Sequence, residues 1–430
     1  MAKKSLKPHK APILGAAFAL GGVALLGLFS FAGPSWDISA SSPDGQVAGD
    51  EVGDTPKPPQ TGVAHVQTPE PTYAIYMSQC VVGTPTFRDK LVTLIDETAL
   101  NAVVVDIKDY SGTIGFPTED PRFADVSLVN CGAGDMKEFI QKLHEKDIYV
   151  VGRITVFQDP SYTKAHPEQA VQSVSRPGQP WKDHKGLSFV NVSSEPYWDY
   201  IVTLSKEAYA LGFDELNYDY VRYPSDGPMA DAAYVDPNKA EALEKFFKYL
   251  HDQVAPTGVV MSADLFGYTT ILTDDLGIGQ QLERALPYFD YIAPMVYPSH
   301  YNKGFAGLAN PNSDPYKVIY TSMAAAVTRA TATETSVKTL DGRPVFKEVV
   351  VPATADQATT TKKVATGTYT KPVHDKLKLR PWLQDFDYGK EYTVEDIDAQ
   401  IRATYDAGLT SWYFWDPANR YDSLRAYLTR

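Results

Sequence analysis

Carboxylates recur at the ends of short apolar runs in this chain, in an arrangement that suits acid–base chemistry. Asp219 lies in the segment GFDELNYDYVRYPSDG, and Asp264 lies in SADLFG. Both aspartates are embedded in otherwise apolar runs, where a buried carboxylate is costly unless it is paired or used. Cleavage of a glycosidic bond needs two carboxyl groups, one to protonate the leaving oxygen and one to attack the sugar or activate water. We therefore interpret Asp219 and Asp264 as a candidate catalytic pair.

Other polar and aromatic residues follow the same runs and are candidates for binding a substrate around this pair. The cationic side chain of Arg222 or Arg153 would keep one carboxylate ionised, while burial keeps the other protonated. The full set of candidate binding residues is Asp106, Asp109, Arg153, Asn217, Arg222, Tyr297, His300, Trp415 and Asp416.

Each of these residues also has a plainer interpretation. A single aspartate at a strand end usually caps a helix or forms a turn, which would account for Asp106, Asp109 or Asp416. Arg222 could merely pair with a nearby carboxylate, and a lone loop histidine such as His300 more often faces solvent. The two aromatic candidates could simply plug the top of a barrel.

Composition excludes several other classes of function. The chain has 430 residues, 53 acidic and 40 basic, so its formal net charge of −13 disfavours nucleic acid as a partner. No HxH or HExxH pattern occurs among the eight histidines, and no CxxC or GxGxxG motif is present. We expect neither a metal nor an organic cofactor.

The elements that must position these residues alternate along the chain as strands and helices. Runs that are apolar on both faces belong to parallel strands covered by helices, and eight of them point to a (β/α)8 barrel of the α/β class. The carboxyl ends of such strands form the active site. The expected strands cover 73–77, 102–107, 148–155, 215–221, 258–265, 291–296, 379–385 and 410–415. The expected helices cover 86–99, 135–146, 195–211, 239–254, 279–286, 315–329 and 394–407, with a last helix ending near 428.

Two segments depart from this rhythm, and together with the barrel they define the domain organisation. Residues 331–376 are rich in Thr and Lys and are read as an insertion with a hairpin around 345–351. Residues 34–71, rich in Pro, Gly and Ser, are read as a flexible linker that precedes a barrel domain over 72–430.

The first 33 residues predict export from the cytoplasm. Four lysines precede an uncharged apolar run over 11–33, and about 20 such residues can span a bilayer. We expect a single-pass membrane anchor, with a cleaved signal peptide as the alternative. Either way the barrel would lie outside the cytoplasm, where Cys80 and Cys131 could form a disulfide, a point that two cysteines cannot decide.

The quoted segments, together with NAVVVDIKDYSGTIGF, YIAPMVYPSHY and SWYFWDPANRY, resemble a bacterial glycoside hydrolase family that was formerly a domain of unknown function. This family is distantly similar to the α-amylase superfamily of barrels, and the resemblance covers about residues 73–428. It implies that Asp219 on strand four is the nucleophile, Asp264 on strand five the acid/base, and Asp385 on strand seven a third acid. Here strand five has an aspartate where amylases have a glutamate, and Asn217 replaces an arginine.

Three hypotheses follow, and they differ in what they predict. A glycoside hydrolase acting on an extracellular or cell-envelope polysaccharide or oligosaccharide should lose turnover when either Asp219 or Asp264 is changed to Asn. A non-catalytic carbohydrate-binding barrel should bind glycans without releasing reducing ends. An envelope scaffold should depend on the 331–376 insertion to bind a protein. The oligomeric state is left open.

Overall fold

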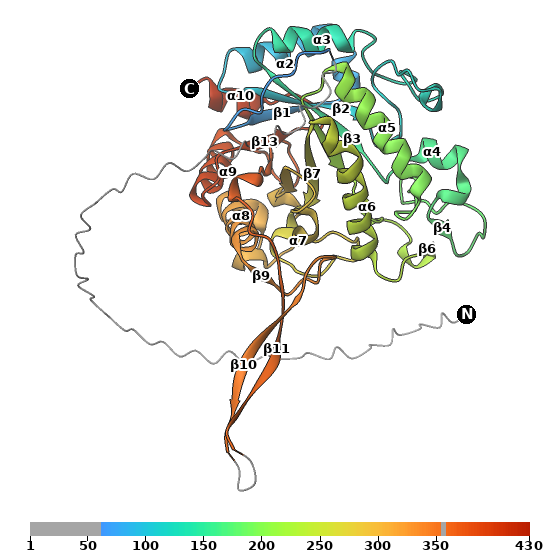
Figure 1. The fold of residues 1–430 in the computed structure, drawn as a ribbon. Coiled ribbons are helices and arrows are strands. Elements are labelled where there is room, and N and C mark those ends of the chain that lie inside the picture. Colours follow the sequence, from blue (N-terminus) through green and yellow to red (C-terminus); the bar gives the residue numbers. More distant parts are fainter. Residues whose placement is uncertain (1–61, 354–357) are drawn as a thin grey trace, which may run out of the picture. The chain divides into compact units, whose positions relative to one another are not determined.

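Eight parallel strands close into a barrel in the computed structural model, which describes residues 62–353 and 358–430. Around the barrel the strands follow the order β1-β13-β12-β8-β7-β5-β3-β2, so the first strand pairs with both the second and the last (Figure 1). The (β/α)8 fold predicted from the sequence is therefore confirmed. The barrel strands are β1 (Tyr73–Met77), β2 (Ala102–Lys108), β3 (Tyr149–Thr155), β5 (Glu215–Asp219), β7 (Val260–Phe266), β8 (Tyr291–Met295), β12 (Trp382–Gln384) and β13 (Trp412–Trp415).

Most of the barrel strands are shorter than the sequence predicted, and for two of them, β12 and β5, the cause is local. Strand β12 begins only at Trp382 because Pro381 before it has no N–H to donate to a neighbouring strand. Strand β5 ends at Asp219 because the next residue, Tyr220, has a φ of 50°, in the left-handed region that no strand adopts. The chain therefore turns sharply just after Asp219, at the mouth of the barrel.

Helices cover the outside of the barrel between successive strands (Figure 1). Two of them match the prediction at both ends, α5 and α6, and the start of α6 is fixed by Asn238, whose side chain accepts a hydrogen bond from the backbone N–H of Glu241. The helices are α1 (Gln79–Val82), α2 (Pro85–Asp96), α3 (Met136–His144), α4 (Pro160–Ala165), α5 (Glu195–Leu211), α6 (Lys239–Val254), α7 (Leu282–Ala285), α8 (Pro315–Thr331), α9 (Val394–Asp406) and α10 (Asp422–Leu428).

The apolar core has two parts that alternate along each strand. Residues such as Ile75 and Val103 belong to the larger cluster, which includes the helices, whereas Ala74, Tyr76 and Val104 belong to a smaller cluster inside the barrel. This alternation is the two-residue period of a strand. It assigns every strand residue to the interior or to the helix-covered face.

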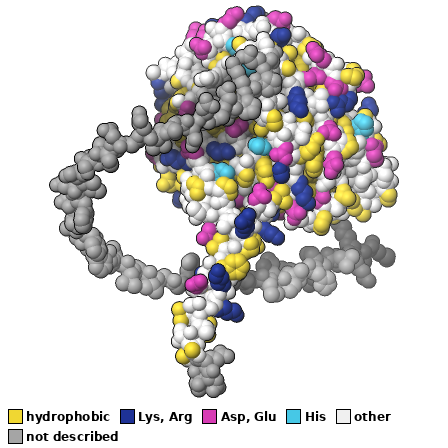
Figure 2. Space-filling model, viewed as in Figure 1, with side chains coloured by type: hydrophobic (Ala, Val, Ile, Leu, Met, Phe, Trp, Pro, Cys, Tyr) yellow, Lys and Arg dark blue, Asp and Glu magenta, His cyan; other side chains and the backbone are white. Residues whose placement is uncertain are grey.

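The insertion before the seventh strand is a long hairpin. Strands β10 (Pro344–Val351) and β11 (Thr360–Thr370) pair antiparallel and extend away from the barrel, with short β9 (Glu334–Thr335) completing a small sheet at their base (Figure 1). Lysine and apolar side chains lie exposed along it (Figure 2). The hairpin predicted near 345–351 is confirmed. A second small sheet pairs β4 (Gln172–Ser173) with β6 (Ala232–Ala233).

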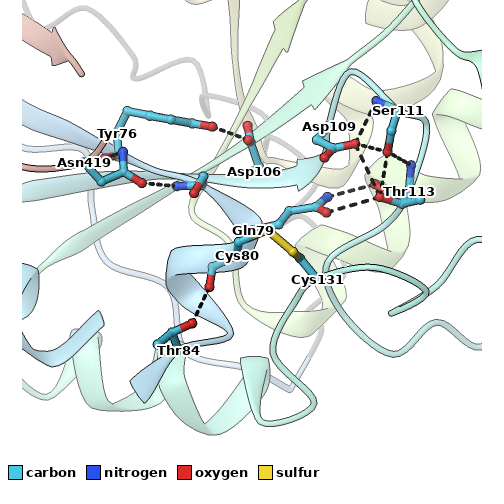
Figure 3. The surroundings of a disulfide bond; sticks show 11 residues. Tyr76, Gln79, Cys80, Thr84, Asp106, Asp109, Ser111, Thr113, Cys131 and Asn419 are labelled. Carbon is cyan, nitrogen blue, oxygen red and sulfur yellow. Dashed lines mark hydrogen bonds between the residues drawn. A yellow bond between two sulfur atoms is a disulfide. The ribbon is translucent and has the colours of Figure 1, made fainter. Parts of the chain in front are cut away.

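Cys80 of α1 and Cys131 form a disulfide, which answers the question that the sequence left open (Figure 3). Next to Cys80, the side-chain amide of Gln79 donates hydrogen bonds to the carbonyl oxygens of Ile107 and Thr113. The disulfide and these hydrogen bonds together hold the region that follows strand β2 in place.

The predicted membrane anchor at 1–33 and most of the predicted linker lie outside the described residues. Over 62–353 and 358–430, no helix has the length and apolar character needed to cross a bilayer.

Candidate active site

A cavity of about 690 Å³ opens at the carboxyl end of the barrel strands. Residues from five of the barrel strands line it, namely β3, β5, β7, β8 and β13. The sequence-predicted residues that line it are Arg153, Asp219, Arg222, Asp264, Tyr297, His300 and Trp415.

Arg153 of strand β3 lies at the centre of this cavity floor. Its Nη1 donates a hydrogen bond of 2.6 Å to Oδ1 of Asp106, and its Nε donates one of 3.1 Å to Oδ2 of Asp219. The guanidinium carbon lies 5.0 Å from the ring centre of Trp415. Arg153 therefore connects strands β2, β3 and β5 and holds a positive charge against Asp219.

Asp264 of strand β7 has a different environment from Asp219. Trp382 Nε1 and Asn217 Nδ2 donate hydrogen bonds of 2.7 and 2.9 Å, both to Oδ1. The side chain is 1% exposed, and this burial raises the pKa of Asp264 well above the ordinary range, an effect to which the nearby charge of Asp219 adds. The surroundings of Asp264 therefore favour its protonated form.

The distances to Arg153 limit how far apart the two carboxylates can be. Nε of Arg153 lies 3.1 Å from Oδ2 of Asp219 and 3.8 Å from Oδ2 of Asp264. The two oxygens cannot be farther apart than the sum of these distances. That limit includes the separation of about 5–5.5 Å found in retaining glycosidases and allows only the lower edge of the range of about 6.5–9.5 Å found in inverting ones.

Asp219 is held in place from two sides. Its Oδ1 accepts a hydrogen bond of 2.5 Å from the backbone N–H of Tyr220, while Arg153 donates to Oδ2 through Nε and also through Nη2. Charge-assisted hydrogen bonds of this kind are short and strong, so they fix the orientation of the Asp219 carboxylate.

Two predicted residues, Asp106 and Asn217, lie beneath the cavity and not in its wall. Asp106 accepts a hydrogen bond of 2.5 Å from the hydroxyl of Tyr76 as well as the one from Arg153. Asn217 donates to Oδ1 of Asp264 and to the hydroxyl of Ser262. Both residues position the cavity's charged side chains.

Three predicted aspartates are not brought into the cavity. Oδ1 of Asp109 accepts hydrogen bonds from the backbone N–H and the hydroxyl of Ser111, at 2.9 and 2.6 Å, and so forms a turn (Figure 3). The side chain of Asp416 accepts backbone hydrogen bonds from residues 418, 420 and 421 and shapes the approach to α10. Asp385 accepts one from the backbone N–H of Leu424 in α10.

Sequence reasoning missed two residues of the site, Tyr76 and Trp382. Tyr76 stacks on Trp415 with ring centres 3.8 Å apart and donates to Asp106. Trp382 donates to Asp264 from the strand predicted to supply Asp385. Both lie at interior positions of their strands, so the two-residue alternation was the signal that could have identified them.

No group of three or more His, Cys, Asp or Glu residues within the described ranges is arranged to hold a metal ion. The protein family described as "Putative glycosyl hydrolase domain" matches residues 74–346 and 347–421. No curated protein sequence matches the chain.

Solved structures give further similarities. The glycoside hydrolase domain of PgaB (BpsB) from Bordetella bronchiseptica is 15% identical, with 83% of this chain and 99% of that chain covered and a TM-score of 0.54. This likeness shows a shared fold. A hypothetical protein from Ruminiclostridium thermocellum is 30% identical over 44% of this chain and 96% of its own, with a TM-score of 0.40.

Proposed function

The chain belongs to this glycosyl hydrolase family, and we propose that it cleaves glycosidic bonds of a polysaccharide with retention of configuration, using Asp219 and Asp264. The observation that carries the proposal is the pair itself. Two carboxylates from neighbouring strands face one cavity, one held by an arginine and the other buried so that its pKa is raised. Glycosidases use this difference to divide the roles of nucleophile and acid.

In the first step Asp264 acts as the general acid. The hydrogen bonds from Asn217 and Trp382 both go to Oδ1, so Oδ2 is the oxygen that carries the proton. This proton passes to the glycosidic oxygen as the bond to the anomeric carbon breaks. The leaving sugar departs as an alcohol and Asp264 becomes an anion.

Asp219 attacks the anomeric carbon during the same step. One of its oxygens forms a covalent bond to that carbon, which gives a glycosyl-enzyme ester. In the second step the Asp264 anion takes a proton from water, the water oxygen attacks the anomeric carbon, and the bond to Asp219 breaks. Arg153 stabilises the carboxylate of Asp219 both before it attacks and when it is released from the sugar.

Arg153 depends in turn on Asp106 and Tyr76. Asp106 pairs with Nη1 and thereby directs Nε and Nη2 towards Asp219. Asp385 has no step in this mechanism, because its side chain reaches α10 and is not part of the cavity lining. The role of third acid that the family resemblance implied for it is not carried forward.

We also propose that the substrate is an extracellular or cell-envelope polysaccharide. The lysine-flanked apolar run in the sequence favours an anchor that places the barrel outside the cytoplasm. The disulfide between Cys80 and Cys131 supports this location, since disulfides persist mainly in oxidising compartments.

Variants at the two aspartates test the mechanism. Asp219→Asn should lower kcat/KM by a factor of roughly 1,000 or more on any substrate found in a panel of polysaccharides and aryl glycosides. Asp264→Asn should lose as much on polysaccharide but much less in the first step on a dinitrophenyl glycoside, because that leaving group needs no proton. Circular dichroism would check folding.

Asp109→Asn is the matched control, since Asp109 also follows a barrel strand but forms a turn outside the cavity. It should keep most of the activity. Full activity in both Asp219→Asn and Asp264→Asn would refute the mechanism. Glycan binding by the unmodified chain with no reducing ends released from any member of the panel would favour a non-catalytic carbohydrate-binding barrel instead.

A further inference from the structure

The catalytic cavity adjoins a second one, and we call the two together the groove. The second cavity has a volume of about 270 Å³ and shares Tyr220, Arg222 and Ser225 with the first. Tyr110, whose side chain is 57% exposed, lines it. An exposed aromatic ring in a groove of this kind can stack on a sugar, so the groove suits several sugar units of one chain.

Arg222 stands at the junction of the two cavities, and it is buried without a carboxylate partner. Its side chain is 8% exposed and packs over the rings of Tyr220 and Phe266, at 4.5 and 4.9 Å. Nη1 donates to the carbonyl oxygen of Tyr223 and to the hydroxyl of Ser225, both at 3.1 Å. Throughout the described part of the chain, no carboxylate lies within 4.0 Å of this guanidinium.

The other buried arginines of the described chain differ from Arg222 in this respect. Each of them has a carboxylate partner within 4.0 Å; these arginines are Arg88, Arg153, Arg284 and Arg380. A buried charge without a partner is costly. Burial lowers the pKa of Arg222, which reflects the same cost.

The acidic groups nearest to Arg222 in the groove are already engaged. Asp219 is bound by Arg153 and by the backbone of Tyr220. Asp183 accepts hydrogen bonds from the backbone N–H groups of Lys185 and Leu187, each at 2.8 Å. Both carboxylates stabilise the positive charge of Arg222 from a distance, but neither forms an ion pair with it. A ligand that enters the groove can therefore supply the carboxylate partner that Arg222 lacks.

We propose that Arg222 binds the carboxylate of an acidic sugar, so that the substrate is a polysaccharide that contains uronic acid or similar carboxylated units. The hydrogen bonds to Tyr223 and Ser225 both use Nη1, so the edge formed by Nε and Nη2, near Tyr220, is the one that can meet a ligand. That edge presents two parallel N–H groups, the geometry that matches the two oxygens of a carboxylate. The inference rests on the proposed function only for its polymeric substrate, and its test measures binding alone.

The test uses the full chain carrying Asp219→Asn, so that no polymer is consumed. Binding is measured by isothermal titration calorimetry at one fixed ionic strength. The probes are polygalacturonate, alginate and hyaluronan, each beside its carboxyl-reduced form, in which the carboxylate has become a neutral hydroxymethyl group. We expect at least one carboxylated polymer to bind at least tenfold more tightly than its reduced form.

Adding Arg222→Gln should remove this preference and leave affinity for the reduced polymer unchanged, whereas Arg222→Lys should keep part of it. Lys185→Gln is the matched control, because it removes the same charge from the same groove. It should change the preference less than twofold.

Three outcomes would overturn the proposal. The first is that no carboxylated polymer binds better than its reduced form. The second is that Lys185→Gln acts as strongly as Arg222→Gln, which would mean general charge attraction. The third is that dextran sulfate binds as tightly and with the same dependence on Arg222. If the mechanism proposed for Asp219 and Asp264 were wrong, these three binding results would not change. Failure of that mechanism can therefore be distinguished from failure of the proposal for Arg222.

Discussion

Burial and the charged and polar groups around Asp264 set its protonation state. Burial and the charge of Asp219 raise the pKa of Asp264, whereas Arg153 and the hydrogen bonds from Asn217 and Trp382 oppose the rise. The general acid must be protonated when substrate binds. Activity should therefore fall on the alkaline side as Asp264 loses its proton. The effect of each neighbour on the pKa of Asp264 can then be measured as a shift of that alkaline limb.

Replacing Trp382 with Phe should move the alkaline limb of kcat/KM to higher pH. The indole N–H stabilises the ionised form of Asp264, so its loss should raise the pKa of Asp264 further. Trp412→Phe is the control, because the Trp412 indole donates to Tyr405 and not to the site. A limb that stays in place or moves to lower pH in Trp382→Phe would contradict this assignment.

Asp385 shows what residue-level prediction could and could not reach. The sequence identified Asp219 and Asp264 because both occur within apolar runs, and the structure brings both into one cavity. Asp385 came from family resemblance, but on its strand the interior cluster includes Trp382, and Leu383 belongs to the outer one. Strand β12 ends at Gln384, so Asp385 lies just after the strand, and its side chain accepts a hydrogen bond from α10.

Asp385→Asn should stabilise the protein more as the pH rises. Burial raises the pKa of Asp385 to about 8. Between about pH 4 and pH 8 the unfolded chain ionises this carboxyl and the folded chain does not, so ionisation favours unfolding increasingly over that range. The gain in melting temperature should be small at pH 4, larger at pH 8, and accompanied by full activity. An equal gain at both pH values, or loss of activity, would contradict this account.

At the scale of elements, strands and helices were predicted well and their ends less well. Helices α5 and α6 match the prediction because apolar periodicity and their flanking residues agree. Strand β5 ends two residues early because of the left-handed turn at Tyr220, which sequence periodicity does not encode. The hairpin of β10 and β11 lies within the insertion predicted over 331–376, but it extends well beyond the 345–351 predicted for the hairpin itself.

The disulfide should stabilise the region that follows strand β2. Cys80 and Cys131 are 51 residues apart, and closing a loop of that length removes unfolded-state entropy worth about 4 kcal/mol at 25 °C. The variant with both cysteines changed to Ser should lose stability by up to that amount in urea titrations. It should also lose activity before global unfolding, because Gln79 beside the bond braces the segment after Asp106. Unchanged stability would contradict a stabilising role of the disulfide.

At the scale of the whole molecule, the chain is acidic and its barrel is proposed to lie outside the cytoplasm. The net charge of −13 favours neither nucleic acid nor a generally anionic ligand. Recognition of a carboxylated polymer would therefore depend on a local cation, Arg222, within an acidic protein. Such recognition is more specific than attraction by a basic surface, because it requires the groove.

The proposed tether can be tested on the full chain in bacterial cells. We expect the protein to sediment with membranes and to be digested by protease added outside the cytoplasmic membrane. A version lacking residues 1–33 should instead stay in the cytoplasm, with Cys80 and Cys131 reduced. Recovery of the unmodified chain in the cytoplasm would contradict the proposed location, while recovery in the medium with the first 33 residues removed would indicate a cleaved signal.

The central claim is that Asp219 forms a covalent bond to the sugar while Asp264 supplies the proton. A 2-deoxy-2-fluoro glycosyl fluoride of the sugar that the enzyme cleaves tests it most directly, because fluoride leaves without a proton and the fluorine at C2 slows release of the intermediate. We expect mass spectrometry of the digested protein to find one sugar on the peptide that contains Asp219, and none in Asp219→Asn. An adduct on Asp264 or Asp385, or product of inverted configuration from the active enzyme, would contradict the account.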